Sequence, residues 1–177
     1  MLRETVLTIR KAELRDVPAI FRLVSHYVAE RVMLPRSVAE LYENVWEFTV
    51  AEEDGEILGC GGLKFYSAEV AEIRSLCVAP GLQKGGVGRS LTESVLREAE
   101  HYSLKTVFAL TLVPVFFEKM GFHEVPREIL PMKVWRDCVH CDRYFQCDEK
   151  TMLLDLPKRA VDVEAVRETS EVSAWSD

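Results

Sequence analysis

Two charged residues stand in an otherwise apolar stretch, residues 71–78, whose β-branched and apolar composition is typical of a buried strand. A strand covered on both sides should be apolar throughout, so Glu72 and Arg74 need an explanation. Either they form a structural ion pair, with each other or with neighbours, or they serve a site. In a site, Glu72 would be a general base toward an amine, directly or through a water, and Arg74 would anchor a substrate carboxylate.

Side chains alternate along a strand, which predicts two faces for this stretch unless a bulge intervenes. One face carries Glu72, Arg74, Leu76 and Val78, and the other carries Ala71, Ile73, Ser75 and Cys77. On this pattern Cys77 points away from Glu72. With no histidine adjacent to activate it, Cys77 is a poor candidate for a catalytic nucleophile.

A glycine-rich turn follows the strand and precedes a helix that is predicted to open near Gly86. It reads Gln83-Lys84-Gly85-Gly86-Val87-Gly88, or Q-x-x-G-x-G. Glycines let the backbone approach a ligand closely, and the free N–H groups and dipole of the helix favour a phosphate there. A Walker A loop is excluded because Val87 follows Gly86, and the dinucleotide pattern G-x-G-x-x-G fails at Leu91.

The elements that must position these residues follow from periodicity and turn signals. Helices are predicted from Asp16, from Ser37 with Glu40 in a capping box to about Trp46, from Gly86 to about Tyr102, and over residues 115–120. Strands are predicted over residues 6–10, 48–51, 57–65, 71–78, 106–112 and 150–155, with Asp54-Gly55 as a hairpin turn. The predicted order is β-α-α-β-β-β-α-β-α-β.

From about residue 7 to residue 121, this order and the Q-x-x-G-x-G loop resemble the GNAT acetyltransferases. The resemblance implies an α/β (α+β) fold, with a central mixed, mostly antiparallel twisted sheet flanked by helices on both faces. It also implies acetyl-CoA as cosubstrate, with the loop on the pyrophosphate and a backbone N–H near Cys77 or Val78 polarising the thioester carbonyl. The cofactor-binding residues implied in this region are Leu76, Cys77, Val78, Gln83, Lys84, Gly85, Gly86, Val87, Gly88 and Arg89.

Many GNAT enzymes place a tyrosine as general acid in an F-Y-x-x-x-G-F motif. The matching stretch, residues 116–122, has Phe117 at that position, so the hydroxyl is missing and Phe117 remains only as a cofactor contact. This departure is chemically tolerable, because a thiol of pKa about 8.5 leaves readily as a thiolate.

Phe117, together with Leu110-Thr111, Gly121-Phe122 and the Ala71-Glu72 strand, resembles the bacterial N-acetylglutamate synthases, and residues 130–154 resemble the tail of their short, single-domain form. The implied function is acetylation of the α-amine of L-glutamate by direct transfer, the first step of arginine biosynthesis. The implied substrate-binding residues are Arg36, Lys64, Arg74 and Thr111. The chain is too short for the amino-acid-kinase-like domain of the long synthases, so inhibition by arginine cannot be assumed.

Two other functions remain open. A GNAT enzyme could act on another amine, such as a protein N-terminus, another amino acid or a polyamine, although a polyamine enzyme should carry acidic residues where Arg36, Lys64 and Arg74 occur. Alternatively, the chain could be a non-catalytic module that senses acyl-CoA or metal, in which the missing tyrosine marks lost chemistry. Glu72 argues against that second alternative.

The cysteines Cys138, Cys141 and Cys147 form a C-x2-C-x5-C pattern with His140 between the first two. They could hold zinc, with His140 or an aspartate as fourth ligand, but a structural zinc site usually has two paired knuckles. Reduced, packed thiols are the favoured interpretation, so no metal is expected.

Composition sets the remaining expectations. A chain of 177 residues with net charge −7 and no basic stripe is expected to be one domain without a nucleic-acid partner. No apolar run is long enough to span a membrane, and residues 1–5 lack the character of a signal peptide, so a cytoplasmic protein is expected. A homodimer is one oligomeric state open to it. Residues 1–156, with the cysteine-containing segment 134–149, are expected to form the acetyltransferase domain. Residues 157–177 are expected to be a polar tail, as a frayed helix or disordered.

Overall fold

A computed structural model of the chain describes residues 6–141 and 144–157. Within them, one mixed sheet has the strand order β1-β2-β3-β4-β5-β7-β6, and all neighbours are antiparallel except β4 and β5. The strands are β1 (Thr8–Lys11), β2 (Phe48–Glu53), β3 (Glu56–Phe65), β4 (Val70–Val78), β5 (Thr106–Thr111), β6 (His123–Val125) and β7 (Lys150–Asp155). The helices are α1 (Val17–Ala29), α2 (Val38–Glu43), α3 (Val87–His101), α4 (Pro114–Glu118) and α5 (Pro131–Arg136).

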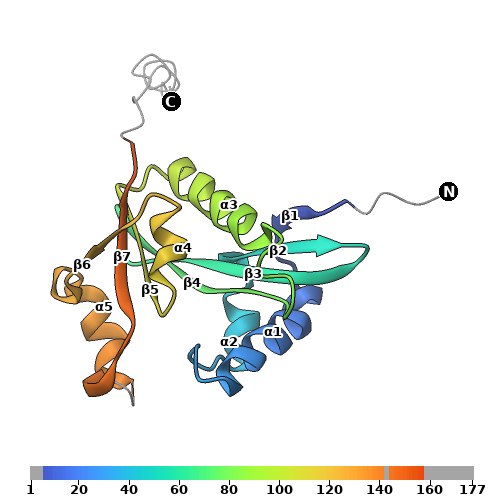
Figure 1. The fold of residues 1–177 in the computed structure, drawn as a ribbon, viewed down its shortest axis with the longest axis horizontal. Helices are drawn as coiled ribbons and strands as arrows, with labels where there is room; N and C mark the ends of the chain where they lie inside the picture. Colours follow the sequence, from blue (N-terminus) through green and yellow to red (C-terminus); the bar gives the residue numbers. More distant parts are fainter. Residues whose placement is uncertain (1–5, 142–143, 158–177) are drawn as a thin grey trace, which may run out of the picture.

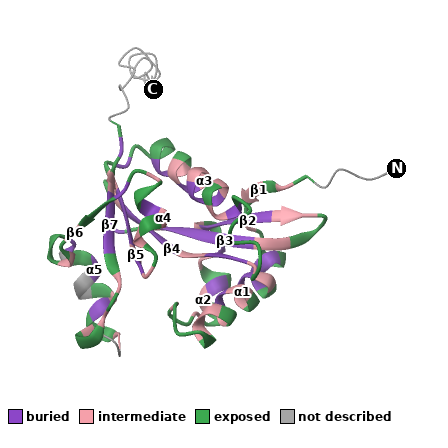
Figure 2. Ribbon diagram, viewed as in Figure 1, coloured by how far each residue is buried: buried purple, intermediate pink, exposed green. Residues whose placement is uncertain are grey.

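The helices cover both faces of the sheet (Figure 1). On one face, α3 and α4 pack their apolar side chains onto the central strands, with Val95, Ala99 and Phe117 in one buried cluster. On the other face, α1 and α2 form a separate cluster with the strands, to which Val24 and Leu41 belong. Burial is continuous along the central strands, while the outward faces of the helices are exposed (Figure 2). The predicted fold class is therefore confirmed.

Local sequence signals explain most of the element boundaries. The Ser37 hydroxyl accepts a hydrogen bond from the Glu40 backbone N–H at 3.1 Å, which caps α2 as predicted. Asp54 and Gly55 have φ of 49° and 84°, the two positive values that a tight hairpin between β2 and β3 requires. Gly86 has φ of 83° and immediately precedes α3.

Asp16 was expected to cap α1, but its side chain makes no capping bond to that helix. Its carboxylate instead accepts two hydrogen bonds from the Arg10 guanidinium, at 2.7 and 3.0 Å, and one from the Glu13 backbone N–H at 2.8 Å. Arg10 also bonds Glu52 on the neighbouring strand at 2.6 Å. Asp16 therefore ties the turn before α1 to the edge of the sheet.

The strand β4 contains a bulge, which changes the predicted alternation of its side chains between the two faces. Glu72, Arg74 and Cys77 pair with Lys64, Gly62 and Cys60 of β3, so two residues of β4, Ser75 and Leu76, lie opposite the single residue Gly61.

Ser75 has φ of 51° at this point. The extra residue reverses the faces beyond it, so the expectation that Cys77 faces away from Glu72 is wrong. Cys77 shares the face of Glu72 and Arg74, whereas Leu76 packs with the opposite cluster that contains Ile73.

Glycines of β3 make room for this bulge. A Cβ on Gly61 would lie 2.9 Å from the Cδ1 atom of Leu76, and a Cβ on Gly59 would lie 2.9 Å from the Cys77 carbonyl oxygen. The Gly59 position would also approach Leu91 of α3 at 3.0 Å. The close approach of β3, β4 and α3 therefore depends on the absence of side chains here.

The predicted second helix ends at Glu43, earlier than Trp46, and the elements β6 and α5 were not predicted. The strand β6 has only three residues, and α5 begins at Pro131 in a segment whose apolar periodicity is short. The predicted tail, 157–177, lies outside the described residues apart from Pro157.

Candidate active site

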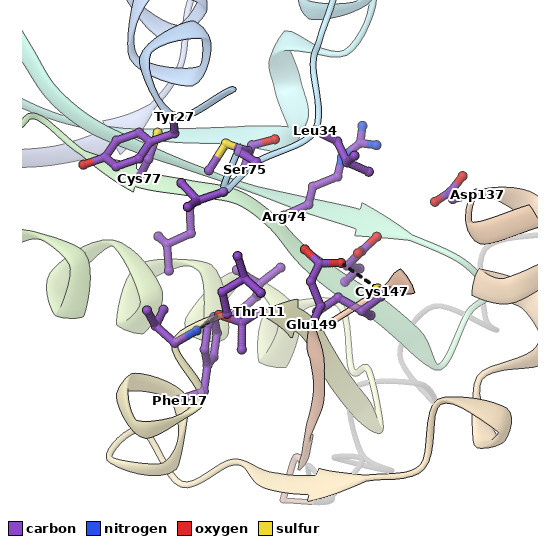
Figure 3. Close-up of a pocket in the computed structure, with 18 of the residues that line it drawn as sticks. Tyr27, Leu34, Arg74, Ser75, Cys77, Thr111, Phe117, Asp137, Cys147 and Glu149 are labelled. Atoms are coloured by element: carbon purple, nitrogen blue, oxygen red, sulfur yellow. Dashed lines mark hydrogen bonds between the residues drawn. The ribbon is translucent and has the colours of Figure 1, made fainter. Parts of the chain in front are cut away.

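The strands β4 and β5 separate along their length and leave a cavity between them. Their parallel pairing covers only Val70–Glu72 against Thr106–Phe108. Beyond Glu72, the two strands line opposite sides of a cavity of about 520 Å³, which the α4 residue Phe117 also lines (Figure 3). Glu72, Arg74 and Thr111, all predicted as site residues, border this one space.

Glu72 is 4% exposed and is held by two donors from other elements. The Lys133 ammonium of α5 lies 2.9 Å from Glu72 Oε1 and 3.1 Å from Oε2. The Tyr66 hydroxyl lies 2.9 Å from Glu72 Oε2. A cation and a phenol thus fix the carboxylate on the cavity wall and compensate its burial.

Asp137, which directly follows α5, completes a buried network. It bonds the Tyr66 hydroxyl, and its Oδ2 atom lies 2.9 Å from Lys133 Nζ and 3.2 Å from Lys64 Nζ. Burial, the Glu72 charge and the hydrogen bond with Asp137 raise the pKa of the Tyr66 phenol. Burial opposes the ionisation of Asp137, but the hydrogen bonds from Tyr66 and Lys133 outweigh it and lower the pKa of that carboxyl.

Lys133 remains a cation in this setting. Burial alone would lower the pKa of its ammonium, but the charges and hydrogen bonds of Glu72 and Asp137 outweigh burial and raise it. Lys64, Lys133 and Arg136 all lie over the Tyr66 ring, at 5.2, 6.0 and 5.2 Å from its centroid. The ring is therefore held in place from both the sheet and α5.

Two arginines line the cavity, and each has one buried donor without a partner in the described part of the chain. Arg74 is 9% exposed and donates to the Glu47 carboxylate at 2.5 Å, and Arg36 donates to the Glu40 carboxylate at 2.6 Å. The Nε–H groups of both arginines are buried and have no hydrogen-bond partner among the described residues. A buried guanidinium N–H without a partner is unfavourable, so an acceptor brought by a ligand would satisfy it.

The other predicted substrate contacts are placed differently. Thr111 lines the cavity, but its hydroxyl accepts a hydrogen bond from the Val113 N–H at 3.0 Å and so shapes the turn after β5. Lys64 is not among the residues that line the cavity, and it contacts the network through Asp137.

The glycine-rich loop borders the cavity at Gln83 and Gly88, while the residues between them and Arg89 lie outside its lining. The Gln83 carboxamide accepts from the Gly81 N–H at 2.9 Å and donates to the Tyr27 hydroxyl at 3.3 Å. Tyr27 of α1 in turn donates to the Val78 carbonyl at 2.5 Å. This chain of bonds fixes the loop against the end of β4, just before the free N–H groups of α3.

Phe117 lies 4% exposed, in edge contact with Phe116 and Phe122 at centroid distances of 5.2 Å each. It presents an apolar surface to the cavity and no hydroxyl. Leu76 of the bulge and the two residues after it, Cys77 and Val78, also line the cavity. The Cys77 and Cys60 sulfurs lie 3.6 Å apart as buried free thiols.

The C-terminal cysteines lie at the same cavity. Cys138, Cys141 and Cys147 are free thiols that border it together with Glu149, whose carboxylate the Cys147 thiol contacts at 3.8 Å. Burial raises the pKa of Glu149 and that of Cys138. Within residues 6–141 and 144–157, no group of three or more His, Cys, Asp or Glu side chains could hold a metal ion.

Tyr66, Lys133, Asp137 and Tyr27 were missed by sequence reasoning. Tyr66 follows a predicted strand, and Tyr27 belongs to the apolar face of a predicted helix. Lys133 and Asp137 lie in a segment in which only the cysteines were considered as site residues. The i, i+4 spacing of Lys133 and Asp137 was the available signal, since it places a cation and a carboxylate on one face of a helical turn.

Comparison with known proteins agrees with this geometry. Residues 43–124 match the model of the acetyltransferase (GNAT) domain. The chain is 39% identical over 148 residues to an uncharacterized N-acetyltransferase of Chlorobaculum tepidum, covering 84% of this chain and 96% of that protein. It is 38% identical over 120 residues to an amino-acid acetyltransferase of Mycobacterium tuberculosis, covering 66% of this chain and 68% of that one.

Among solved structures, N-acetylglutamate synthase from Neisseria gonorrhoeae, complexed with coenzyme A and N-acetyl-glutamate, superposes with a TM-score of 0.76 at 27% identity. The match covers 88% of this chain and 36% of that one. A Mycobacterium tuberculosis protein in complex with CoA matches with a TM-score of 0.72 at 31% identity, covering 85% and 99%.

This chain belongs to the GNAT acetyltransferases. It is an acetyl-CoA-dependent N-acetyltransferase, with amino-acid acetyltransferases among its relatives. None of the helices in the described part of the chain is long and apolar enough to cross a membrane.

Proposed function

We propose that this enzyme acetylates the α-amine of L-glutamate and so belongs to arginine biosynthesis. The observation that carries the proposal is a pair of arginines, the half-buried Arg36 and the buried Arg74, that border the same cavity as Glu72. Each has a buried Nε–H without a hydrogen-bond partner among the described residues. Glutamate has two carboxylates, and guanidinium groups bind carboxylates with directed, charge-assisted hydrogen bonds. The neighbouring amino-acid acetyltransferases support the same substrate class.

Acetyl-CoA suits the shape of this cleft. The cavity extends from Glu72 to Gly88, at the start of α3, where the free backbone N–H groups favour a pyrophosphate. Gln83 to Gly88 and Arg89 would hold that group, and Leu76, Cys77, Val78 and Phe117 would border the thioester end. When bound, acetyl-CoA supplies the activated acetyl group.

Each residue of the site would have a separate role in the reaction. Glu72 accepts a proton from the α-ammonium, directly or through a water, and so produces the nucleophilic amine. Arg36 and Arg74 orient the substrate carboxylates, and Thr111 shapes the wall of the turn beside them. Phe117 excludes water without donating a proton, so the departing sulfur leaves as a thiolate, which takes up the second proton that the nitrogen loses as the amide forms.

The test is Glu72→Gln, which keeps the shape of the side chain and one acceptor oxygen but removes its charge and basicity. We expect turnover to fall by about 10²- to 10⁴-fold, the range that general acid–base assistance contributes. Acetyl-CoA affinity, measured by calorimetry, should change less than about twofold because Glu72 does not contact the loop of Gln83. Wild-type turnover in this variant would refute the base assignment and leave the fold assignment intact.

A further inference from the structure

Tyr66 stands between two carboxylates, and its single proton cannot serve both. The hydroxyl oxygen lies 2.9 Å from Glu72 Oε2 and is also hydrogen-bonded to Asp137 Oδ2. A hydroxyl donates one proton at a time, so it can donate to one carboxylate while accepting from the other only if that other carboxyl is protonated. This is the arrangement through which a proton can pass from one carboxyl to the next.

The two carboxylates differ in their access to solvent. Both border the cavity, but Glu72 is 4% exposed, whereas the side chain of Asp137 is 29% exposed. With the amine and acetyl-CoA in place, water is displaced from the cavity side of Glu72. A proton taken up by Glu72 then needs another exit, and the Tyr66 hydroxyl is the neighbour that continues toward the surface.

We propose that Tyr66 and Asp137 form a proton relay that clears Glu72 after it deprotonates the amine. The proposal rests on the assignment of Glu72 as base. The substrate N–H bond breaks and a Glu72 O–H bond forms. That proton then moves to the Tyr66 oxygen while the Tyr66 proton moves to Asp137, which releases it to water. One proton has left the amine for solvent, and no electrons are transferred.

The surroundings favour this passage over trapping of the proton. Lys133 contacts both carboxylates, at 2.9 Å from Glu72 Oε1 and 2.9 Å from Asp137 Oδ2, so its positive charge lies beside both ends of the relay. Lys64 adds a second cation beside Asp137. The raised pKa of Tyr66 keeps the phenol protonated between turnovers, so the relay is ready for each new proton. Tyr66 and Asp137 are positioning residues in this scheme, because they act through Glu72.

The experiment compares wild type with Tyr66→Phe and Asp137→Asn in H2O and D2O, using the amino acid that wild type acetylates. Tyr66→Phe keeps the ring between Phe108 and the three cations and removes the hydroxyl alone. We expect kcat to fall roughly a hundredfold, the lower end of general acid–base assistance. KM for both substrates should stay within about twofold, and the solvent isotope effect on kcat should rise because proton release becomes rate-limiting. Asp137→Asn should change kcat and the isotope effect in the same direction.

Tyr42→Phe, at an exposed tyrosine of α2, is the matched control and should match wild type throughout. A Tyr66→Phe protein with wild-type kcat, or with lower kcat but an unchanged isotope effect, would overturn the relay. If Tyr66→Phe unfolds at lower urea than wild type, Asp137→Asn decides by the same criteria. Failure of the base assignment is distinct: Glu72→Gln would then stay active, whereas failure of the relay alone leaves Glu72→Gln inactive and Tyr66→Phe normal.

Discussion

Arg74 is either a substrate anchor or half of a structural ion pair, and replacing it by glutamine separates the two roles. Its guanidinium donates to Glu47 at 2.5 Å, and both side chains are largely buried, at 8% and 12% exposure. Arg74 also lines the cavity, and its buried Nε–H has no hydrogen-bond partner among residues 6–141 and 144–157. In Arg74→Gln, the substrate loses a charged donor and Glu47 is left unpaired.

The structure sets the size of each loss. A hydrogen bond to a charged group contributes about 1.5–3 kcal/mol, and each 1.36 kcal/mol is tenfold, so kcat/KM for glutamate should fall about tenfold to a hundredfold. Breaking a buried pair costs about 3–5 kcal/mol of unfolding free energy, and the partial exposure here places the cost of Arg74→Gln near the lower value. The KM for acetyl-CoA should stay within about twofold of wild type.

The double variant Glu47→Gln/Arg74→Gln removes both charges and so leaves no buried ion unpaired. Urea unfolding should recover most of the lost stability, while steady-state kinetics with glutamate should remain impaired. If the double variant recovers activity together with stability, Arg74 acts only by neutralising Glu47, and the reasoning that makes it a carboxylate anchor is refuted.

Two further predictions concern the scaffold. Although burial opposes it, the pairing with Arg10 lowers the folded-state pKa of Asp16 below its ordinary 3.8, so its stabilisation is present above about pH 4 and is lost as pH falls through the folded value. Asp16→Asn should therefore lower the unfolding free energy by about 2 kcal/mol at pH 7 and by much less at pH 2 to 3, and an equal loss at both pH values in urea titrations would contradict this. Gly59→Ala should lower the unfolding free energy by about 1–3 kcal/mol, because the new Cβ meets the Cys77 carbonyl oxygen at 2.9 Å. Gly62→Ala is the control: its Cβ has only ordinary contacts, so the loss should be under about 1 kcal/mol. Similar thermal midpoints for both variants would show that the bulge tolerates a side chain.

Much of the fold could be predicted because its signals are local. The hairpin at Asp54-Gly55, the cap at Ser37 and the strand over residues 150–155 each depend on a few neighbouring residues, and the structure has all three. The bulge at Ser75 could not be placed, since it depends on how β3 lies against β4. A one-residue insertion inverts every later side chain, which is why Cys77 was assigned to the wrong face.

The site was predictable in part for the same reason. Glu72 and Arg74 stand out because charges in a buried strand violate its apolar pattern, and the structure places both at the cavity. Their partners are not local: Lys133 lies 61 residues from Glu72, and Glu47 lies 27 residues from Arg74. Lys64 was predicted as a substrate contact from its charge, but its ammonium pairs with Asp137 and does not line the cavity.

The proposed acetylation of L-glutamate can be tested by measuring acetyl-CoA turnover against a panel of free amino acids, with products identified by mass spectrometry. We expect a clear preference for L-glutamate. L-glutamine lacks the second carboxylate that Arg36 and Arg74 would bind, and L-aspartate lacks the length, so both should be weaker substrates. Turnover of other amines with none of glutamate would contradict the substrate and retain the acetyltransferase. Binding of acetyl-CoA without turnover of any amine would contradict the role assigned to Glu72 as well.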